Sequence, residues 1–594
     1  MASPRSAGNT KKNEGLPLPG FFANPWIEVI AGCIVFGGLC TLSLDPFLIP
    51  GIVWICSWPL FHFADRYQNH AWKLLGIGAL GAMFLCLFSF YWMLHLFSTY
   101  GGLNIALGLL IFIPYTILLN LKIPMFLVAF GFAKRFETKL PPMWLVAATL
   151  CVLTDYLAPQ VFPWYWGNLA GKNRPLSQVA EFAGVYGISF LHFAGSYALY
   201  ALFKTILHSI AQGQEKASEA VMSALKSGAW SDNRGKWAVP TLFAIVLVWG
   251  YVRLYQMANV EKQSPHVRVA MIQPNTRLPR AGEGLIPRDE VRDILENRIP
   301  SLVGKAAAAG PLDMIVLPES AVPNNLTTQD NMVTRIEGIY SPEFASMMQK
   351  LATKYKATVY ANEVAADVKL DRVTGRPRPI EFNSSIVYSP DGGRREYYHK
   401  RTLLAFGEYI PGAEFLDSSG LIALVPEAVR YSRFERGESA HNLTYYVKKE
   451  GAQPAGTFLP LICYEVLIPE YVRSYFDDSN PGFIVNITQD GWYGKTVETY
   501  QHFGLGRIRA IELRRAIVRS TNSGSSGFVN LSGDYVEPLL GPRLSGQEVE
   551  EVQVWDVPVN WVDPTFYVRF GNLWILILAV GVAGWTTVRV RSRK

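Results

Sequence analysis

Long apolar runs constrain this chain more than any other feature of its sequence. Seven of them follow one another between residues 26 and 257, and an eighth lies close to the C-terminus. A bilayer crossing needs about 20 mostly apolar residues, a length that several runs reach although the first two are short. We therefore expect eight transmembrane helices. The runs cover residues 26–43, 47–63, 72–98, 103–133, 142–158, 179–207, 236–257 and 567–588.

Composition agrees with a membrane protein that carries one soluble domain. Half of the 594 residues are hydrophobic and only 17% are charged. Of the six cysteines, five lie within the apolar runs and only Cys463 lies outside them. This distribution offers neither a disulfide framework nor a CxxC metal pattern. We expect no structural zinc, no other metal and no cofactor.

Basic residues predict the orientation of the runs. The N-terminal tail, the pair Lys134 and Arg135, and the C-terminal tail from Arg589 fall on one side of the predicted membrane. The loops at 44–46 and 98–102, on the other side, carry no lysine or arginine. The positive-inside rule then places both termini in the cytoplasm. The segment between the seventh and eighth runs lies outside it, which in a bacterium with two membranes is the periplasm.

That long segment has the sequence pattern of an α/β domain. Short β-rich runs such as 267–272 and 483–487 alternate with helical stretches such as 288–308. About 300 residues are enough to bury a core of their own. The expected organisation is a cytoplasmic tail at 1–25, a seven-helix transmembrane domain at 26–258, a periplasmic domain at 259–563, a last transmembrane helix at 564–588 and a cytoplasmic tail at 589–594.

Three carboxylates lie in or near the apolar runs. Glu28, Asp155 and Glu181 would be costly if they faced lipid without a partner. The sequence does not identify a partner for any of them.

Cys463 is predicted to lie at a strand-to-helix turn. Residues 458–462 are apolar and are typical of a buried strand, while Pro469 opens a helical stretch that reaches residue 476. Backbone N–H groups and the positive helix end at such a turn favour a thiolate and a developing oxyanion. The alternative is a small buried thiol without a chemical role.

Two charged residues stand in apolar surroundings elsewhere in the domain. Glu319 directly follows the apolar run 314–317, and Lys400 precedes an aromatic and aliphatic stretch that includes Glu408. Buried charges need partners or a task, although Glu319 could also be a solvated loop carboxylate. Together with Cys463, these residues supply a base, a cation and a nucleophile, the groups that acyl transfer requires.

The motifs that hold these residues resemble the nitrilase superfamily. They are LPES at 317–320, HKRTLLAFGEYIP at 399–411, LICYE at 461–465 and QDGWYG at 489–494. With the flanking apolar runs, the chain resembles the membrane-integrated apolipoprotein N-acyltransferase family within that superfamily. The resemblance implies an α+β membrane protein. An eight-helix transmembrane bundle would carry an extracytoplasmic, nitrilase-like αββα sandwich.

The resemblance also implies roles for the residues that match the family motifs. Glu319 would be the general base, Lys400 the cation that holds the oxyanion, and Cys463 the nucleophile. The implied supporting residues are Glu408, Tyr464, whose N–H would be a second oxyanion donor, and Glu465. For the two supporting glutamates the alternative is an ordinary ion pair.

Two departures from the family pattern concern the positioning of substrate. The family usually has asparagine where this chain has Gln489, and proline where it has Ala405. An apolar arm between Gly412 and Pro426, which includes Phe415, is a candidate lipid contact, and a core-packed helix is the alternative. The tentative substrate-binding residues are Trp164, Asn383, Leu421, Leu424 and Trp492. Of these, Trp164 and Trp492 could also be anchors at the membrane surface.

The implied activity is a ping-pong N-acyl transfer. A phospholipid would donate an acyl chain to Cys463 as a thioester. The α-amine of the N-terminal diacylglyceryl-cysteine of an apolipoprotein would then accept it. The expected partners are these two substrates and the bilayer, with no nucleic acid, and the protein would be a monomer of the bacterial inner membrane. The alternatives are a membrane-tethered nitrilase-type amidohydrolase of a small C–N substrate and a non-enzymatic transporter or binding protein.

Overall fold

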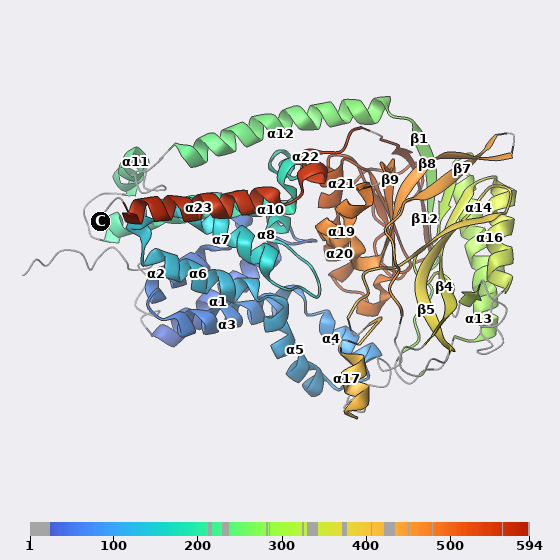
Figure 1. Ribbon diagram of the computed structural model, residues 1–594, viewed down its shortest axis with the longest axis horizontal. Helices are drawn as coiled ribbons and strands as arrows, with labels where there is room; N and C mark the ends of the chain where they lie inside the picture. The colour runs from blue at the N-terminus through green and yellow to red at the C-terminus, as the bar shows by residue number, and fades with distance from the viewer. Residues whose placement is uncertain are drawn as a thin grey trace, which may run out of the picture.

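The computed structural model has a helical part and a sheet part at opposite ends of an elongated molecule (Figure 1). We call residues 24–263 and 566–591 the helical domain, and residues 266–558 the sheet domain. The structure describes residues 24–591 except 212–216, 228–236, 281–282, 284–285, 324–325, 329–341, 371–376, 406, 411, 421–433, 450, 478 and 561.

Within the described residues, four helices are long and apolar enough to cross a membrane. They are α1 (Pro25–Leu42), α3 (Ala71–Ser89), α10 (Ala180–Ala211) and α12 (Ala238–Gln263). A fifth crossing results if the bent pair α5 (Ile105–Leu119) and α6 (Lys122–Lys134) counts as one span. Two shorter apolar helices are α7 (Met143–Leu157) and α23 (Leu573–Arg591).

The expected helix over 47–63 is wrong. This stretch holds only the 3-10 turn η3 (Ile52–Trp54) and the start of the 10-residue helix α2 (Trp58–Tyr67). At about 1.5 Å per residue, α2 is about 15 Å long, half the thickness of a bilayer core. Prolines at positions 46, 50 and 59 explain the difference, because proline lacks the N–H that a helix interior needs.

The three carboxylates in or near the apolar runs all have partners. Glu28 accepts from His62 at 2.7 Å and pairs with Arg66 at 2.8 Å. The pair between Lys122 and Asp155, at 2.9 Å, is completely buried. Each charge therefore has the partner that burial requires. Glu181 pairs with both Arg253 and Arg514, each at 2.6 Å.

The sheet domain contains two sheets. The first has strands in the order β12, β1, β2, β4, β5 and β6, with β3 paired to β4; the second has the order β11, β10, β9, β8, β7. The first set is β1 (His266–Gln273), β2 (Met314–Val316), β3 (Leu326–Thr328), β4 (Thr358–Leu370), β5 (Pro377–Tyr388), β6 (Arg394–His399) and β12 (Glu551–Pro558). The second is β7 (Leu443–Lys449), β8 (Gly451–Ile462), β9 (Phe483–Thr488), β10 (Ile517–Thr521) and β11 (Gly527–Val529).

Helices cover the outer faces of the two sheets, so the layers run helix, sheet, sheet, helix (Figure 1). The rings of Tyr360 on β4 and Phe458 on β8 meet edge to face between the sheets, 5.0 Å apart. The outer helices are α13 (Arg288–Asp293), α14 (Ile299–Ala307) and α16 (Pro342–Tyr355) on one side, and α19 (Pro469–Arg473), α20 (Glu498–Gly506) and α21 (Ile508–Leu513) on the other. The expected αββα sandwich is confirmed.

Continuous apolar runs form the central parallel strands. All six residues of β9 are buried, and β9 pairs in parallel with both β8 and β10. A strand covered on both faces has no solvent side and so shows no polar alternation. This is why the strand expected over 483–487 could be recognised as a short apolar run.

The sheet domain rests directly on the helical domain. The backbone N–H of Val185 on α10 donates to Glu512 on α21 at 2.7 Å, and the indole of Trp92 donates to Gln501 on α20 at 2.9 Å. The chain enters the sheet domain three residues after α12 ends, at His266 on β1. It leaves at Pro558 on β12, the antiparallel partner of His266.

Candidate active site

Cys463 lies at the expected turn between a strand and a helix. It follows the last residue of β8 and begins the 3-10 helix η9 (Cys463–Leu467), which leads into α19. Its φ of 57° lies in the left-handed region, which non-glycine residues occupy only when their surroundings hold them there. Part of that hold comes from Asn486 on β9, whose amide donates to the carbonyl oxygen of Cys463 at 3.0 Å.

Glu319 and Lys400 converge on this turn from the other sheet. Glu319 follows β2 and Lys400 follows β6. The Lys400 ammonium lies 3.7 Å from the Glu319 carboxylate, and both side chains are buried. The charges of both act on the Cys463 thiol. The two sheets thus bring a carboxylate, an ammonium and a thiol together at their shared interior.

Glu408 and Asn383 hold the two charged groups in place. The Lys400 ammonium lies 2.9 Å from Glu408, a closer approach than to Glu319. The Asn383 amide donates to Glu319 at 2.7 Å and to Glu408 at 2.8 Å. Asn383, expected as a substrate contact, therefore uses both amide hydrogens to bridge the two carboxylates.

Burial sets the protonation states in this site. It raises the pKa of the Cys463 thiol, the negative charge of Glu319 raises it further, and Lys400 offsets only part of the rise. This raised pKa favours the protonated thiol, in contrast to the thiolate expected at such a turn. Burial also raises the pKa of Glu319, although Lys400 opposes the shift.

Lys400 remains charged. Burial acts to lower its pKa, but the negative charges of Glu408 and Glu319 outweigh burial and raise it well above the usual value. The arrangement is therefore a fixed cation, a thiol with a raised pKa and a buried carboxylate.

Glu465 ties the Cys463 turn to the loop that follows Lys400. Its carboxylate accepts from the backbone N–H groups of Ile462, Arg401 and Thr402 at 2.9 to 3.1 Å. The hydroxyl of Tyr464 donates to the carbonyl of Leu403 in the same loop at 2.7 Å. Two of the three supporting residues expected from the sequence, Tyr464 and Glu465, thus link the Cys463 turn to this loop.

The tentative substrate contacts divide into three groups. Trp164 is only 1% exposed and its ring lies 3.5 Å from the Lys122 ammonium, so the expectation of a substrate contact or membrane anchor is wrong. Trp492 is 38% exposed and packs against Tyr100 of the helical domain, with ring centroids 4.9 Å apart. Leu421 and Leu424 lie outside the described residues.

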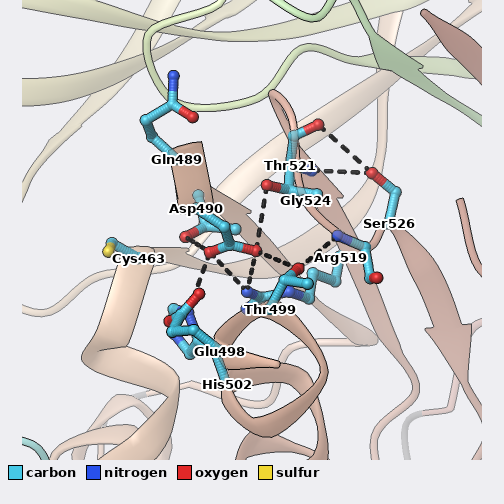
Figure 2. Close-up of polar contacts among 12 residues, drawn as sticks. Cys463, Gln489, Asp490, Glu498, Thr499, His502, Arg519, Thr521, Gly524 and Ser526 are labelled. Carbon is cyan, nitrogen blue, oxygen red and sulfur yellow. Dashed lines mark hydrogen bonds and ion pairs between the residues drawn. The ribbon is translucent and has the colours of Figure 1, made fainter. Parts of the chain in front are cut away.

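A buried polar cluster that sequence reasoning did not assign surrounds Asp490 (Figure 2). Asp490 accepts from the guanidinium of Arg519 at 3.0 and 3.1 Å, and from Thr499 and His502. Asp490, Glu498 and His502 form the one group among the described residues whose donor atoms could hold a metal ion. Because Arg519 already supplies a cation to both oxygens of Asp490, the cluster fits an internal ion pair better. Its sequence signal is an arginine inside the β-rich run 517–520.

Comparisons with known proteins agree with the two domains. The family described as carbon-nitrogen hydrolase matches residues 268–538, and the apolipoprotein N-acyltransferase N-terminal domain matches residues 36–198. Nit3 of Saccharomyces cerevisiae, of the nitrilase superfamily, is 16% identical, with a TM-score of 0.33 over 50% of this chain and 90% of Nit3. The sheet domain is a carbon–nitrogen hydrolase domain.

Relatives of similar length extend the match to nearly the whole chain. Apolipoprotein N-acyltransferase 2 of Leptospira interrogans is 32% identical over 94% of this chain and 95% of its own. The apolipoprotein N-acyltransferase of Bdellovibrio bacteriovorus is 26% identical over 94% of each chain. The protein belongs to the apolipoprotein N-acyltransferase family.

Proposed function

We propose that this protein transfers an acyl chain from a phospholipid to the α-amine of the N-terminal diacylglyceryl-cysteine of an apolipoprotein. The observation that carries the proposal is the buried Glu319, Lys400 and Cys463 site on a domain packed against apolar helices. The site supplies the groups for acyl transfer, and the helices supply access to lipid.

In the first half-reaction, Glu319 removes the proton of the Cys463 thiol. The thiolate attacks the ester carbonyl of the phospholipid, and Lys400 and the N–H of Tyr464 hold the resulting oxyanion. When the intermediate collapses, the C–O bond breaks and Glu319 returns the proton to the departing lysophospholipid oxygen. The raised pKa of the thiol makes the nearby base necessary.

In the second half-reaction, the acceptor amine attacks the thioester. Glu319 takes a proton from the attacking nitrogen, the C–S bond breaks, and the proton returns to Cys463. The products are the amide and the free enzyme. Thioester chemistry suits this step because a thiolate leaves readily when an amine attacks.

The same proposal includes eight crossings of the bacterial inner membrane and a periplasmic sheet domain, with the protein acting as a monomer. The irregular second crossing is supported by its contacts: Arg66, at the end of α2, pairs with Glu28 in the first turn of α1. At the other end of α1, Asp45 pairs with Lys172 at 3.3 Å. Irregular backbone at membrane depth is tolerated where protein surrounds it.

Intact-mass measurement tests the proposal. The purified protein is incubated with mixed vesicles of phosphatidylethanolamine and phosphatidylglycerol, and should gain the mass of one acyl chain on Cys463. Cys463→Ala should gain none while it remains folded in the membrane. A wild-type protein that stays unmodified by phospholipid but hydrolyses a small amide would support the amidohydrolase instead.

A further inference from the structure

The carbonyl group of Cys463 accepts a hydrogen bond from the first of three buried side chains that are linked in series. The Asn486 amide donates to this carbonyl at 3.0 Å, and Arg519 donates to the Asn486 oxygen at 2.7 Å. The same guanidinium bonds both oxygens of Asp490 (Figure 2). We call these side chains the Asn486–Arg519–Asp490 network.

The network fixes the direction of the Asn486 amide. An arginine can only donate hydrogen bonds, so the oxygen of the amide must face Arg519. The NH₂ group must then face the carbonyl of Cys463. Arg519 is itself held by Asp490, which accepts from Thr499 at 2.9 Å and from His502 at 3.1 Å. The orientation of the Asn486 amide at Cys463 therefore depends on the contacts of Asp490, which does not itself touch the Cys463 carbonyl.

A second connection runs from Asp490 to the thiol. The hydroxyl of Thr488 donates to Asp490 at 3.2 Å, and the same hydroxyl interacts with the Cys463 thiol. Asp490 is thus linked to both the backbone carbonyl and the side chain of Cys463. Thr488 and the three side chains of the network are buried.

The planar peptide between Cys463 and Tyr464 transmits this restraint from the Cys463 carbonyl to the Tyr464 N–H. In a trans peptide the C=O and the following N–H point in opposite directions, so fixing the Cys463 carbonyl also fixes the Tyr464 N–H. A left-handed φ is unfavourable for a cysteine, so the turn needs such support. Oxyanion donors are effective only when they are held in place before the reaction.

We propose that the Asn486–Arg519–Asp490 network positions the Tyr464 N–H as an oxyanion donor. The inference rests on the proposed function, because only acyl transfer develops an oxyanion at this site. These are positioning residues, since none of them touches the reacting carbonyl.

The test compares two reactions of the same thiol. Acylation by phosphatidylethanolamine–phosphatidylglycerol vesicles develops an oxyanion, whereas alkylation by iodoacetamide displaces iodide and develops none. Both start from the thiolate, so a changed thiol pKa slows both alike. The ratio of the acylation rate to the alkylation rate therefore isolates oxyanion stabilisation.

The first variant is Asn486→Asp, which keeps the shape and the bond from Arg519 but loses the NH₂ group. We expect the ratio to fall at least about 10-fold, towards the 10²–10³-fold loss that removal of one oxyanion donor causes. Arg519→Lys is the second variant, in case the first does not fold. It retains a cation for Asp490, and the ratio should fall in the same direction.

The matched control is Asn560→Asp. Asn560, two residues after β12, is also buried, and its amide also donates to a backbone carbonyl, that of Arg514 at 2.8 Å. Its ratio should equal that of the wild type. If Asn486→Asp and Arg519→Lys slow both reactions equally, or leave the ratio within about twofold of the control, the proposal is overturned. Absence of acylation in the wild type would instead reject the proposed function.

Discussion

The ammonium nitrogen of Lys400 lies 2.9 Å from the carboxylate of Glu408. Glu408 also accepts from the backbone N–H of Leu404 at 2.8 Å, so its position is fixed from two directions. Lys400 therefore has a permanent counter-ion other than Glu319, which leaves the Glu319 carboxylate available for proton transfer. The two glutamates have different roles although both are near the same lysine.

Replacing Glu408 by glutamine should weaken the base. Burial is the main cause that raises the pKa of Glu319, with the Glu408 charge adding to it and Lys400 opposing it. In Glu408→Gln the pKa of Glu319 should fall, and a weaker base should slow acylation by about 10-fold. Because Glu319 acts only when ionised, the acidic limb of the pH–rate profile should move to lower pH. An unmoved limb would mean that Glu408 does not tune Glu319.

The roles of Glu319 and Lys400 can be separated by following the acyl-enzyme. Glu319→Gln should prevent thioester formation, because the protonated thiol then has no base. Lys400→Ala should slow it by about 10²-fold or more, through loss of oxyanion stabilisation. A time course of intact mass measures both, with the exposed Glu283→Gln as a control that should match the wild type. Accumulated acyl-enzyme in Glu319→Gln would reassign this residue to the second half-reaction.

The apolar arm predicted between Gly412 and Pro426 should matter for lipid substrates in particular. Phe415, on the short helix α17 (Ala413–Ser418), is 67% exposed. Each CH₂ that leaves the bilayer must be covered again at about 0.8 kcal/mol, and an exposed apolar arm can do this. Phe415→Ser, or Leu421→Ser with Leu424→Ser, should reduce turnover of phospholipid much more than that of a short-chain thioester. Equal losses together with a large drop in Tm would instead identify the arm as core.

The buried Lys122–Asp155 pair should be essential for stability. Asp155 also accepts from Ser189 at 2.9 Å and from the backbone N–H of Trp166 at 3.1 Å. Lys122→Met removes the cation and leaves a buried carboxylate unpaired, which should cost about 3–5 kcal/mol. Adding Asp155→Leu should recover part of the loss, because no unpaired charge then remains. Thermal unfolding in detergent measures both variants, and a double variant less stable than Lys122→Met would contradict this account.

The cluster behind the nucleophile should make the protein sensitive to acid. Burial, together with the charge of Arg519, lowers the pKa of His502 to about 4, while Asp490 and Glu498 also face the ring. An unfolded histidine binds a proton near pH 6.5, so the unfolded state takes up a proton before the folded state as the pH falls.

The free energy of unfolding should therefore decrease by about 3 kcal/mol between pH 6.5 and pH 4 because of this residue. His502→Gln should remove most of that decrease, which unfolding midpoints at pH 7.5 and pH 4.5 can measure. If the variant and the wild type lose the same stability, His502 is not responsible.

Local motifs predicted the candidate catalytic residues. The residues behind them could not be predicted, because their contacts depend on strand pairing between distant parts of the chain. Glu319, Lys400 and Cys463 each follow a recognisable strand, so their chemistry could be inferred from short stretches of sequence. Asn486 and Arg519 are direct partners in the parallel pair β9 and β10. Thirty-odd residues separate them in the chain, and only the sheet register brings the amide to the guanidinium.

In the helical domain, hydropathy predicted which segments are apolar but not which of them form one continuous helix. The run at 47–63 is apolar enough for a membrane, but an average over residues does not register its prolines. Trp164 stands at the end of an apolar run, as a surface anchor would. Its actual place, over the ammonium of Lys122 on another helix, depends on tertiary packing.

His266 and Pro558, the first and last residues of the sheet domain, are paired in neighbouring strands, and this pairing bears on how such a protein can arise. A domain whose first and last strands are neighbours can be inserted into a host at a single point. A bundle of membrane helices could have gained this catalytic unit between two existing helices, without changing the path of either. For the same reason, exchanging the unit between relatives requires only two junctions, which lie side by side.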